Sequence, residues 1–144
     1  MSDLELAKNR LKRKSLSLVI VKEGKLLFES RLSGINGLLE AIDKLSDKMH
    51  QSSVADKVVG RAAALLLAYS HVRETYAETV SKEGLKVLRE NDVAVEYAVL
   101  VPQILDRTGK NICPFEKFSS NIKSPSEAYE RLKAFAMKLN PNGL

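Results

Sequence analysis

Hydrophobic and polar residues along the chain form patterns that predict both strands and helices. The strand-like runs LSLVIV, residues 16–21, and KLLFES, residues 25–30, lie on either side of Lys22-Glu23-Gly24. A tight turn in which the glycine takes a positive φ would join these runs as an antiparallel hairpin. Three later apolar runs, over residues 57–59, 71–80 and 93–100, are also strand-like. We therefore predict five strands.

Apolar residues at helical spacing predict helices before, between and after these strands. The first helix covers residues 1–14, and the helix over residues 61–69 is too apolar to face water. Ser81 is a suitable N-cap for the helix after the fourth strand. Ser124-Pro125-Ser126-Glu127 has the pattern of a capped helix start. The apolar faces of the other helices are marked by Leu4, Ala7 and Leu11, by Leu38, Leu39, Ile42, Leu45 and Met49, by Leu85 and Leu88, and by Ala128, Leu132, Phe135, Ala136 and Leu139.

The order of these elements indicates an α/β fold. Strands that alternate with helices pair in parallel through right-handed crossovers, and only the first hairpin is antiparallel. We therefore predict a five-stranded mixed sheet in a three-layer α/β/α sandwich, with crossover helices on both faces. The chain has no linker-like or low-complexity stretch, so we expect residues 1–144 to form a single domain.

The composition is typical of a globular protein that has no membrane partner. Of the 144 residues, 44% are hydrophobic and 28% are charged, and no apolar run approaches the roughly 20 residues that cross a bilayer. The first residues lack the apolar core of a signal peptide, and a single cysteine cannot form an internal disulfide. We expect a cytoplasmic protein.

Basic residues are concentrated in the first helix. Residues 1–14 contain five basic and two acidic residues, which account for more than half of the net charge of +5. A basic helix can attract phosphate groups or acidic partners, but this segment has no aromatic residue that could stack on a base. We interpret it as a solvated helix face and keep binding of a protein or nucleic acid as the alternative.

Three segments of the chain resemble a known family. They are Asp56-Lys57-Val58-Val59-Gly60-Arg61-Ala62-Ala63-Ala64, Tyr76-Ala77-Glu78 continuing to Ser81, and Cys113-Pro114-Phe115-Glu116. Together with the order of the elements over residues 15–135, they are similar to an uncharacterised prokaryotic family filed among domains of unknown function. The resemblance implies a cytidine-deaminase-like fold. It implies no activity, because none is established for that family.

The sequence excludes the standard zinc chemistry of deaminases. A zinc deaminase carries H-x-E and P-C-x-x-C motifs, which supply three zinc ligands and a glutamate that transfers protons. In that fold these motifs open the helices after the second and third strands, where this chain has Gly34-Ile35-Asn36-Gly37-Leu38 and Gly60-Arg61-Ala62-Ala63-Ala64. Cys113, His50 and His71 belong to neither motif. The chain also lacks a P-loop and a G-x-S-x-G motif, and we expect neither a metal nor a cofactor.

Without zinc, the starts of these two helices favour an anion. Helix N-termini carry unpaired N–H groups and partial positive charge, and glycines there let a ligand approach the backbone. Arg61 would add a forked pair of donors for a phosphate or carboxylate; the alternative is a solvated side chain beside turn glycines. The leading hypothesis is a small anionic or nucleotide-like ligand bound by Gly34, Asn36, Gly37, Asp56, Gly60, Arg61, Ser81 and Glu116.

Cys113 supports a further hypothesis. Pro114 suits the first position of a short helix, so Cys113 would be its N-cap, where a thiol can become a nucleophile. A thiol enzyme centred on Cys113 also needs a base, and the sequence places no histidine beside it. A small buried cysteine is the alternative. The sequence leaves open whether the protein is an enzyme and whether it forms a homodimer.

Overall fold

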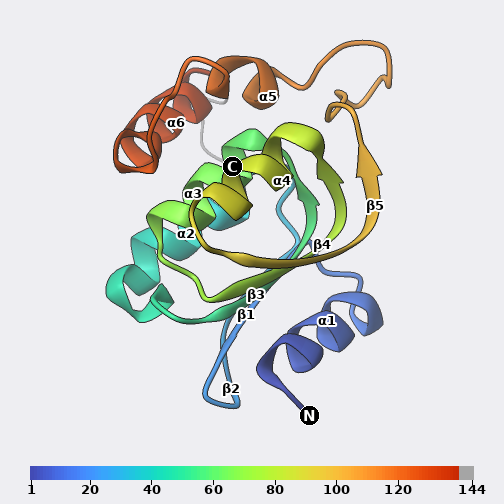
Figure 1. Cartoon of the computed structure of the whole chain (residues 1–144), viewed down its shortest axis with the longest axis vertical. Helices are drawn as coiled ribbons and strands as arrows, with labels where there is room; N and C mark the ends of the chain where they lie inside the picture. Colours follow the sequence, from blue (N-terminus) through green and yellow to red (C-terminus); the bar gives the residue numbers. More distant parts are fainter. Residues whose placement is uncertain (140–144) are drawn as a thin grey trace.

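The five strands form one mixed sheet (Figure 1). The computed structural model describes residues 1–139; the last residues of the predicted domain, 140–144, lie outside the described residues. The predicted mixed sheet is confirmed, because β1 pairs antiparallel with β2 whereas β3, β4 and β5 are parallel. The prediction that only the hairpin is antiparallel was wrong, because β1 also pairs antiparallel with β3. Across the sheet the order is β2 (Lys25–Ser30), β1 (Leu18–Lys22), β3 (Ser53–Val59), β4 (Glu74–Ser81) and β5 (Ala94–Val101).

The turn between β1 and β2 is fixed by its own backbone and by the first helix. Glu23 and Gly24 have φ values of 52° and 76°, and such a pair of positive φ values suits the twist of a two-residue hairpin loop. The Asp3 carboxylate accepts hydrogen bonds from the backbone N–H groups of Glu23 at 2.8 Å and Gly24 at 2.9 Å. The start of α1 (Asp3–Arg13) is thereby attached to the hairpin.

The crossover helices cover one face of the sheet, so the prediction that they cover both faces was wrong. In Figure 1, α2 (Asn36–Leu45), α3 (Arg61–Tyr69) and α4 (Lys82–Glu90) lie on the side opposite α1. From β2 to β3, β4 and β5 the chain moves across the sheet in one direction, and right-handed crossovers then place each helix on the same side. α1 covers the other face, where Ala7 and Leu11 are buried.

α3 is apolar on all sides because other elements surround it. Each of its residues from Ala62 to Ala68 is buried. The sheet lies beneath it, α2 and α4 lie alongside, and α5 (Pro114–Ser119) and α6 (Pro125–Leu139) lie across its outer side (Figure 1). The predicted helix over residues 61–69 is therefore confirmed, and its lack of a polar face reflects its central position in the largest apolar core.

Two strands begin at other positions than the sequence indicated. β3 begins at Ser53 instead of residue 57. The earlier start was missed because Ser53 and Asp56 are polar, although both are buried within the strand. β4 begins at Glu74 instead of residue 71, because His71 adopts a φ of 54° in the turn that follows α3. In both cases the local pattern of polar and apolar residues did not predict where the strand starts, because strand pairing depends on the neighbouring strands.

The helix ends follow local backbone preferences. Ser81 caps α4 as predicted, because its hydroxyl accepts a hydrogen bond from Gly84 N at 3.0 Å. The helix expected to reach residue 49 ends earlier, at Leu45, and its C-cap residue Ser46, with a φ of 47°, leads into the 3₁₀ turn η1 (Ser46–Met49). Within residues 1–139, each helix is either too short or too polar to span a membrane.

Candidate ligand-binding cleft

A cleft lies at the edge of the sheet where β3 ends. It is bounded by the start of α2 and by the segment that joins β5 to α5, and its volume is about 560 Å³. A narrower recess of about 50 Å³ shares part of this lining and reaches Gly60 at the start of α3. Polar residues of the cleft include Ser33, Asn36, Asp106 and Arg107, and apolar ones include Val58, Ile104 and Phe115.

The start of α2 lines this cleft and carries no side-chain cap. The chain reaches it through Gly34, whose φ of 62° suits glycine, and through Ile35, the N-cap residue, which makes no capping hydrogen bond. The first turn contains no acidic residue, and the Asn36 amide donates to Ser33 O at 3.1 Å. The N–H groups of this first turn therefore keep the partial positive charge of a helix N-terminus.

Arg107 brings a cation to the same cleft. It belongs to a turn in which Thr108 N and Thr108 Oγ1 donate to Asp106 Oδ1 at 3.0 and 2.6 Å. The Thr108 hydroxyl is the main cause of the lowered pKa of the Asp106 carboxyl. From this turn, Arg107 Nη2 donates to Ser33 Oγ at 3.2 Å. The sequence gave no sign that Arg107 would meet Ser33.

The start of α3 already holds an anion, and it is the carboxylate of Glu116. Glu116 Oε1 accepts a hydrogen bond from Arg61 N at 2.6 Å, and Glu116 Oε2 accepts one from Ile104 N at 2.8 Å. A Cβ atom added to Gly60 would lie 2.9 Å from Glu116 Oε1, so glycine at this position leaves room for the carboxylate. The Glu116 side chain thus takes the place beside the Gly60 backbone where a ligand was expected to approach.

The Arg61 side chain lies away from the cleft and binds backbone carbonyl groups. Its Nε donates to Ser119 O at 3.0 Å and its Nη2 donates to Ile122 O at 2.8 Å. A weaker ion pair joins its Nη1 to Glu83 Oε1 at 3.6 Å, and 15% of the side chain is exposed. The forked donor expected to hold a ligand therefore holds the segment between α5 and α6. The structure does not bring the Arg61 guanidinium together with Asn36.

Three other residues of the predicted site lie outside the cleft. The Ser81 hydroxyl is buried as the cap of α4. A Cβ atom on Gly37 would lie 3.1 Å from Ser30 Oγ, so this glycine allows α2 to pack against the end of β2. Asp56 is buried in β3, where it is paired with Ala77 of β4. Burial raises the pKa of Asp56 to about 8, although backbone N–H groups of β3 act in the opposite direction.

Cys113 lines the cleft and is the N-cap residue of α5, as predicted, but its side chain makes no capping hydrogen bond. It is half-buried, and its backbone N–H donates to Ile104 O at 2.9 Å. The rings of His50 and His71 are 5.2 Å apart and precede β3 and β4, at the opposite end of these strands. The structure thus brings Cys113 to the cleft without a histidine base.

The residues at the two helix starts do not fit the zinc ion of deaminases. The starts of α2 and α3 contain Asn36, Arg61, glycines and aliphatic residues, none of which is a usual zinc ligand. Within residues 1–139, no group of three or more His, Cys, Asp or Glu side chains is arranged so that it could hold a metal ion.

Comparisons with known proteins agree with this architecture. The model of a family described as a domain of unknown function (DUF1893) matches residues 6–136. A solved DUF1893 family protein from Thermotoga maritima is 32% identical, with a TM-score of 0.85 over 92% of this chain and 88% of that one. RibD from Acinetobacter baumannii is 15% identical, with a TM-score of 0.51 over 66% of this chain and 34% of RibD.

A dCMP deaminase from the cyanophage S-TIM5 is 17% identical, with a TM-score of 0.49 over 66% of this chain and 93% of that one. No curated protein matches the sequence. At such low identity the likeness to RibD shows the fold alone. The α/β fold of this chain is deaminase-like, as the sequence predicted.

Proposed function

The chain belongs to the DUF1893 family, and we propose that its cleft binds a small ligand that carries a phosphate or carboxylate group. One observation carries this proposal. The uncapped N-terminus of α2 lines a cleft of about 560 Å³ that also contains Arg107. Partial positive charge from the helix and a full positive charge from the guanidinium therefore act on the same volume. The Asp106 carboxylate also lines the cleft, where its Oδ1 accepts two hydrogen bonds from Thr108.

The position and size of the cleft support the binding of a small molecule. Pockets for such ligands have volumes of about 300–1,000 Å³. In open α/β sheets, ligands bind beyond the carboxyl ends of the strands, and this cleft lies beyond the carboxyl end of β3. Inside it, the backbone of α2 and the Arg107 guanidinium would contact the anionic group, with Ser33 and Asn36 as further polar partners.

The apolar part of the cleft favours a ligand with a flat or hydrophobic body. Val58, Ile104 and Phe115 line it, and Phe115 also packs edge-on against Phe135 with ring centroids 5.5 Å apart. An aromatic ring held in this way offers a firm surface for a base or another ring. A nucleotide-like molecule, with an anionic group and a ring, combines both requirements.

In this proposal the residues around α3 shape the cleft and do not contact the anion. Glu116 lines the inner recess, but both of its carboxylate oxygens accept backbone hydrogen bonds. A second anion at the start of α3 would face the Glu116 charge at close range, which is unfavourable. The ligand-binding residues that we propose are Ser33, Gly34, Asn36 and Arg107, with Cys113 close by.

The alternative of a macromolecule bound through the basic helix has less support. Lys8 forms an ion pair with Glu96, and Arg10 forms one with Glu29. Lys8 also lies 4.7 Å from the centre of the Tyr76 ring. These intramolecular partners reduce the positive field that a phosphate backbone would meet.

The proposal is tested by thermal unfolding with AMP, ribose 5-phosphate and neutral adenosine as probes. A ligand that binds the folded state raises Tm with a saturating dependence on its concentration. We expect saturation with at least one of the two phosphate esters and weaker binding of adenosine.

Arg107→Ala should weaken phosphate-ester binding by about tenfold or more, because a hydrogen bond to a charged group contributes roughly 1.5–3 kcal/mol. Lys110→Ala is the matched control, since it removes a cation from the same turn at a residue that is exposed and does not line the cleft. The absence of a saturable shift with either ester, or equal binding by Arg107→Ala, would contradict the proposal.

A further inference from the structure

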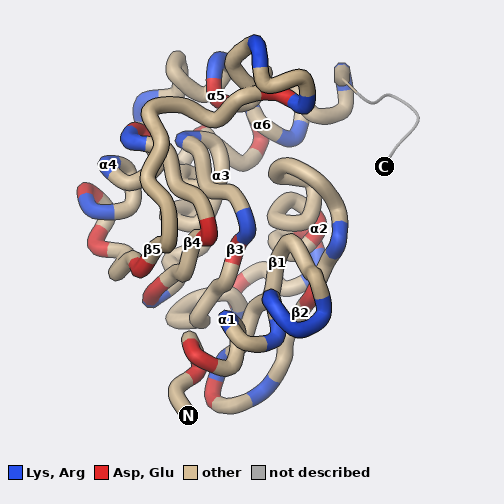
Figure 2. The backbone as a smooth tube through the Cα atoms, turned by 90° about the vertical axis from the view of Figure 1, so that its right-hand side faces the viewer, with Lys and Arg blue, Asp and Glu red and all other residues tan. Residues whose placement is uncertain are grey.

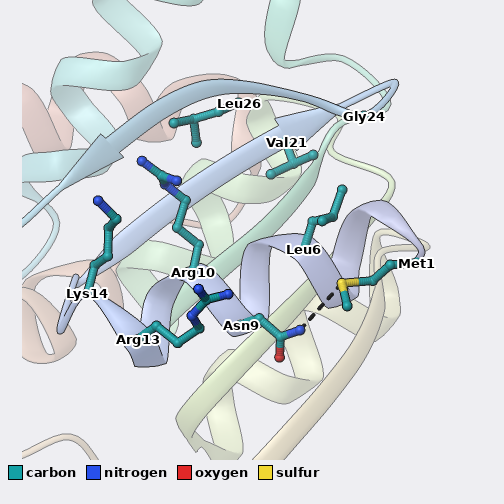
Figure 3. A pocket seen from close by; sticks show the side chains of 9 residues that line it. All are labelled: Met1, Leu6, Asn9, Arg10, Arg13, Lys14, Val21, Gly24 and Leu26. Carbon is teal, nitrogen blue, oxygen red and sulfur yellow. Dashed lines mark hydrogen bonds between the residues drawn. The ribbon is translucent and has the colours of Figure 1, made fainter.

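A second pocket lies on the opposite face of the sheet, between α1 and the β1–β2 hairpin (Figure 3). Its volume is about 400 Å³. It exists because α1 packs mainly against β1, β3 and β4 through the buried Ala7 and Leu11, which leaves β2 beside the helix. Leu26 of β2 consequently remains 43% exposed at the pocket.

The two ends of this pocket differ in chemistry. Figure 3 shows the side chains of Arg10, Arg13 and Lys14 at one end and those of Leu6 and Val21 at the other. Leu26 lies on the hairpin side, above the helix, so apolar contacts come from both elements. A pocket with a basic end and an apolar end matches a molecule with the same division.

Positive charge at the basic end is only partly neutralised. Arg10 Nε lies 2.5 Å from Glu29 Oε2, whereas within the described residues 1–139 neither Arg13 nor Lys14 has an ion-pair partner. The pKa of the Glu29 carboxyl is lowered, chiefly by the hydrogen bond from Arg10 and further by the charges of Lys14 and Arg31. In Figure 2, Lys and Arg segments also mark the hairpin beside α1.

We propose that this pocket binds a small amphipathic anion, that is, a carboxylate or phosphate ester with an apolar chain or ring. The anionic head would contact Arg13 and Lys14, and the apolar body would lie against Leu6, Val21 and Leu26. Burial of the apolar body supplies about 25 cal/mol per Å², and the guanidinium supplies paired donors for the head. This site is separate from the cleft at the start of α2 and does not depend on the function proposed for that cleft.

Two simpler explanations account for less of the geometry. Basic residues in the last turn of a helix interact favourably with its dipole, but this does not explain an open apolar floor beside them. A helix that lies on a membrane exposes its apolar face, whereas Ala7 and Leu11 of α1 are buried against the sheet at 0% and 2% exposure. A free amphipathic molecule therefore fits better than a bilayer.

The test is a titration of the full ¹⁵N-labelled chain with decanoate, followed by NMR. We expect one saturable site, with shift changes centred on the amides of residues 6–14 and 21–26. Acetate has the head without the chain, and decanol has the chain without the charge. Each should bind at least about tenfold more weakly than decanoate, because each lacks one class of contact.

Two variants address the two ends of the pocket. Arg13→Ala combined with Lys14→Ala should weaken decanoate binding by about tenfold or more. Leu26→Glu should abolish it, and because Leu26 is exposed the variant should fold. Lys82→Ala combined with Lys86→Ala, at exposed positions of α4, is the matched control and should bind as the wild type does.

Three results would overturn the proposal. One is decanoate binding that does not saturate or that maps to other residues. Another is equal affinity for decanol. The third is sedimentation of the chain with phosphatidylglycerol vesicles that is lost in Leu26→Glu, since that would assign the pocket to a membrane surface.

Discussion

The Glu116 carboxylate accepts a hydrogen bond from the backbone N–H of Arg61 at 2.6 Å, across 55 positions of the chain. This contact gives the start of α3 a negative partner from within the protein, with Ile104 N as the second donor at 2.8 Å. It also explains why the start of α3 has no room for a further anion, whereas the start of α2 lines the cleft. Of the two helix starts that the sequence indicated, one is occupied by Glu116 and the other has no side-chain cap.

Replacement of Glu116 should show how much this internal anion contributes to stability. Glu116→Ala leaves the N–H groups of Arg61 and Ile104 without their carboxylate acceptor, and we expect the free energy of unfolding to fall by roughly 2–4 kcal/mol. Glu116→Gln, which keeps one acceptor oxygen, should cost less. Urea unfolding measures both, with the exposed Glu90→Gln as a control expected within about 0.5 kcal/mol of the wild type. Equal stability of Glu116→Ala and the wild type would show that the contact contributes nothing.

Arg61→Ala should separate stability from ligand binding. The guanidinium donates to Ser119 O and Ile122 O and is largely buried, so its loss should lower the free energy of unfolding by about 1–3 kcal/mol. Arg61→Lys should recover little, because a single ammonium group cannot reproduce the fork. Affinity for phosphate esters in the cleft should stay at the wild-type value. A large loss of affinity without a loss of stability would instead identify Arg61 as a ligand-binding residue.

Asp56→Asn should change the pH dependence of stability. The unfolded carboxyl releases its proton near its ordinary pKa of 3.8, whereas burial holds the folded pKa at about 8. Between these values, rising pH therefore favours the unfolded state, and the contribution of Asp56 to stability declines from about pH 4 to pH 8.

Asparagine has a similar shape and does not ionise. The variant should therefore gain stability relative to the wild type as pH rises from 5 to 8, by a few kcal/mol in total. Urea midpoints measured across this range provide the comparison. A difference between the two proteins that does not change with pH would show that Asp56 is ionised in the folded state.

Leu11→Ala should reveal how α1 is attached to the sheet. Leu11 is 2% exposed and packs in a cluster with Val19, Val21 and Tyr76, and truncation of a buried leucine costs about 2–5 kcal/mol. Leu26→Ala is the matched control, because Leu26 is 43% exposed and its truncation should cost less than about 1 kcal/mol. Urea unfolding measures both losses. If Leu11→Ala cost as little as Leu26→Ala, α1 would not be packed into the core.

Local patterns in the sequence sufficed for most of the fold. The hairpin around Gly24, the apolar helix over residues 61–69 and the Ser81 cap each depend on residues close together in the chain, and each was predicted. The start of β3 was missed because Ser53 and Asp56 are polar yet buried, and no local rule indicates that neighbouring strands will enclose them. The face on which the crossover helices lie depends on strand order, which spacing alone does not fix.

The candidate site was less predictable for the same reason. Glycines and helix starts directed the prediction to the end of the sheet where the cleft lies, since these features follow from strand and helix boundaries. The partner of the Arg61 amide, Glu116, lies 55 positions away, and Arg107 lies 74 positions from Ser33. Such pairs arise only when the β5–α5 segment folds back over the sheet. The sequence therefore favoured Arg61 as a ligand-binding residue and did not single out Arg107.

The proposal of a ligand in the cleft is tested most directly through Cys113. This residue lines the cleft and is the single cysteine of the chain, so alkylation by iodoacetamide reports on the site without any substitution. We predict that AMP or ribose 5-phosphate slows alkylation with a saturating concentration dependence, that Arg107→Ala requires about tenfold more ligand, and that Lys110→Ala behaves as the wild type. The account would be contradicted if neither ester changed the alkylation rate at any concentration at which the protein and the ester remain soluble.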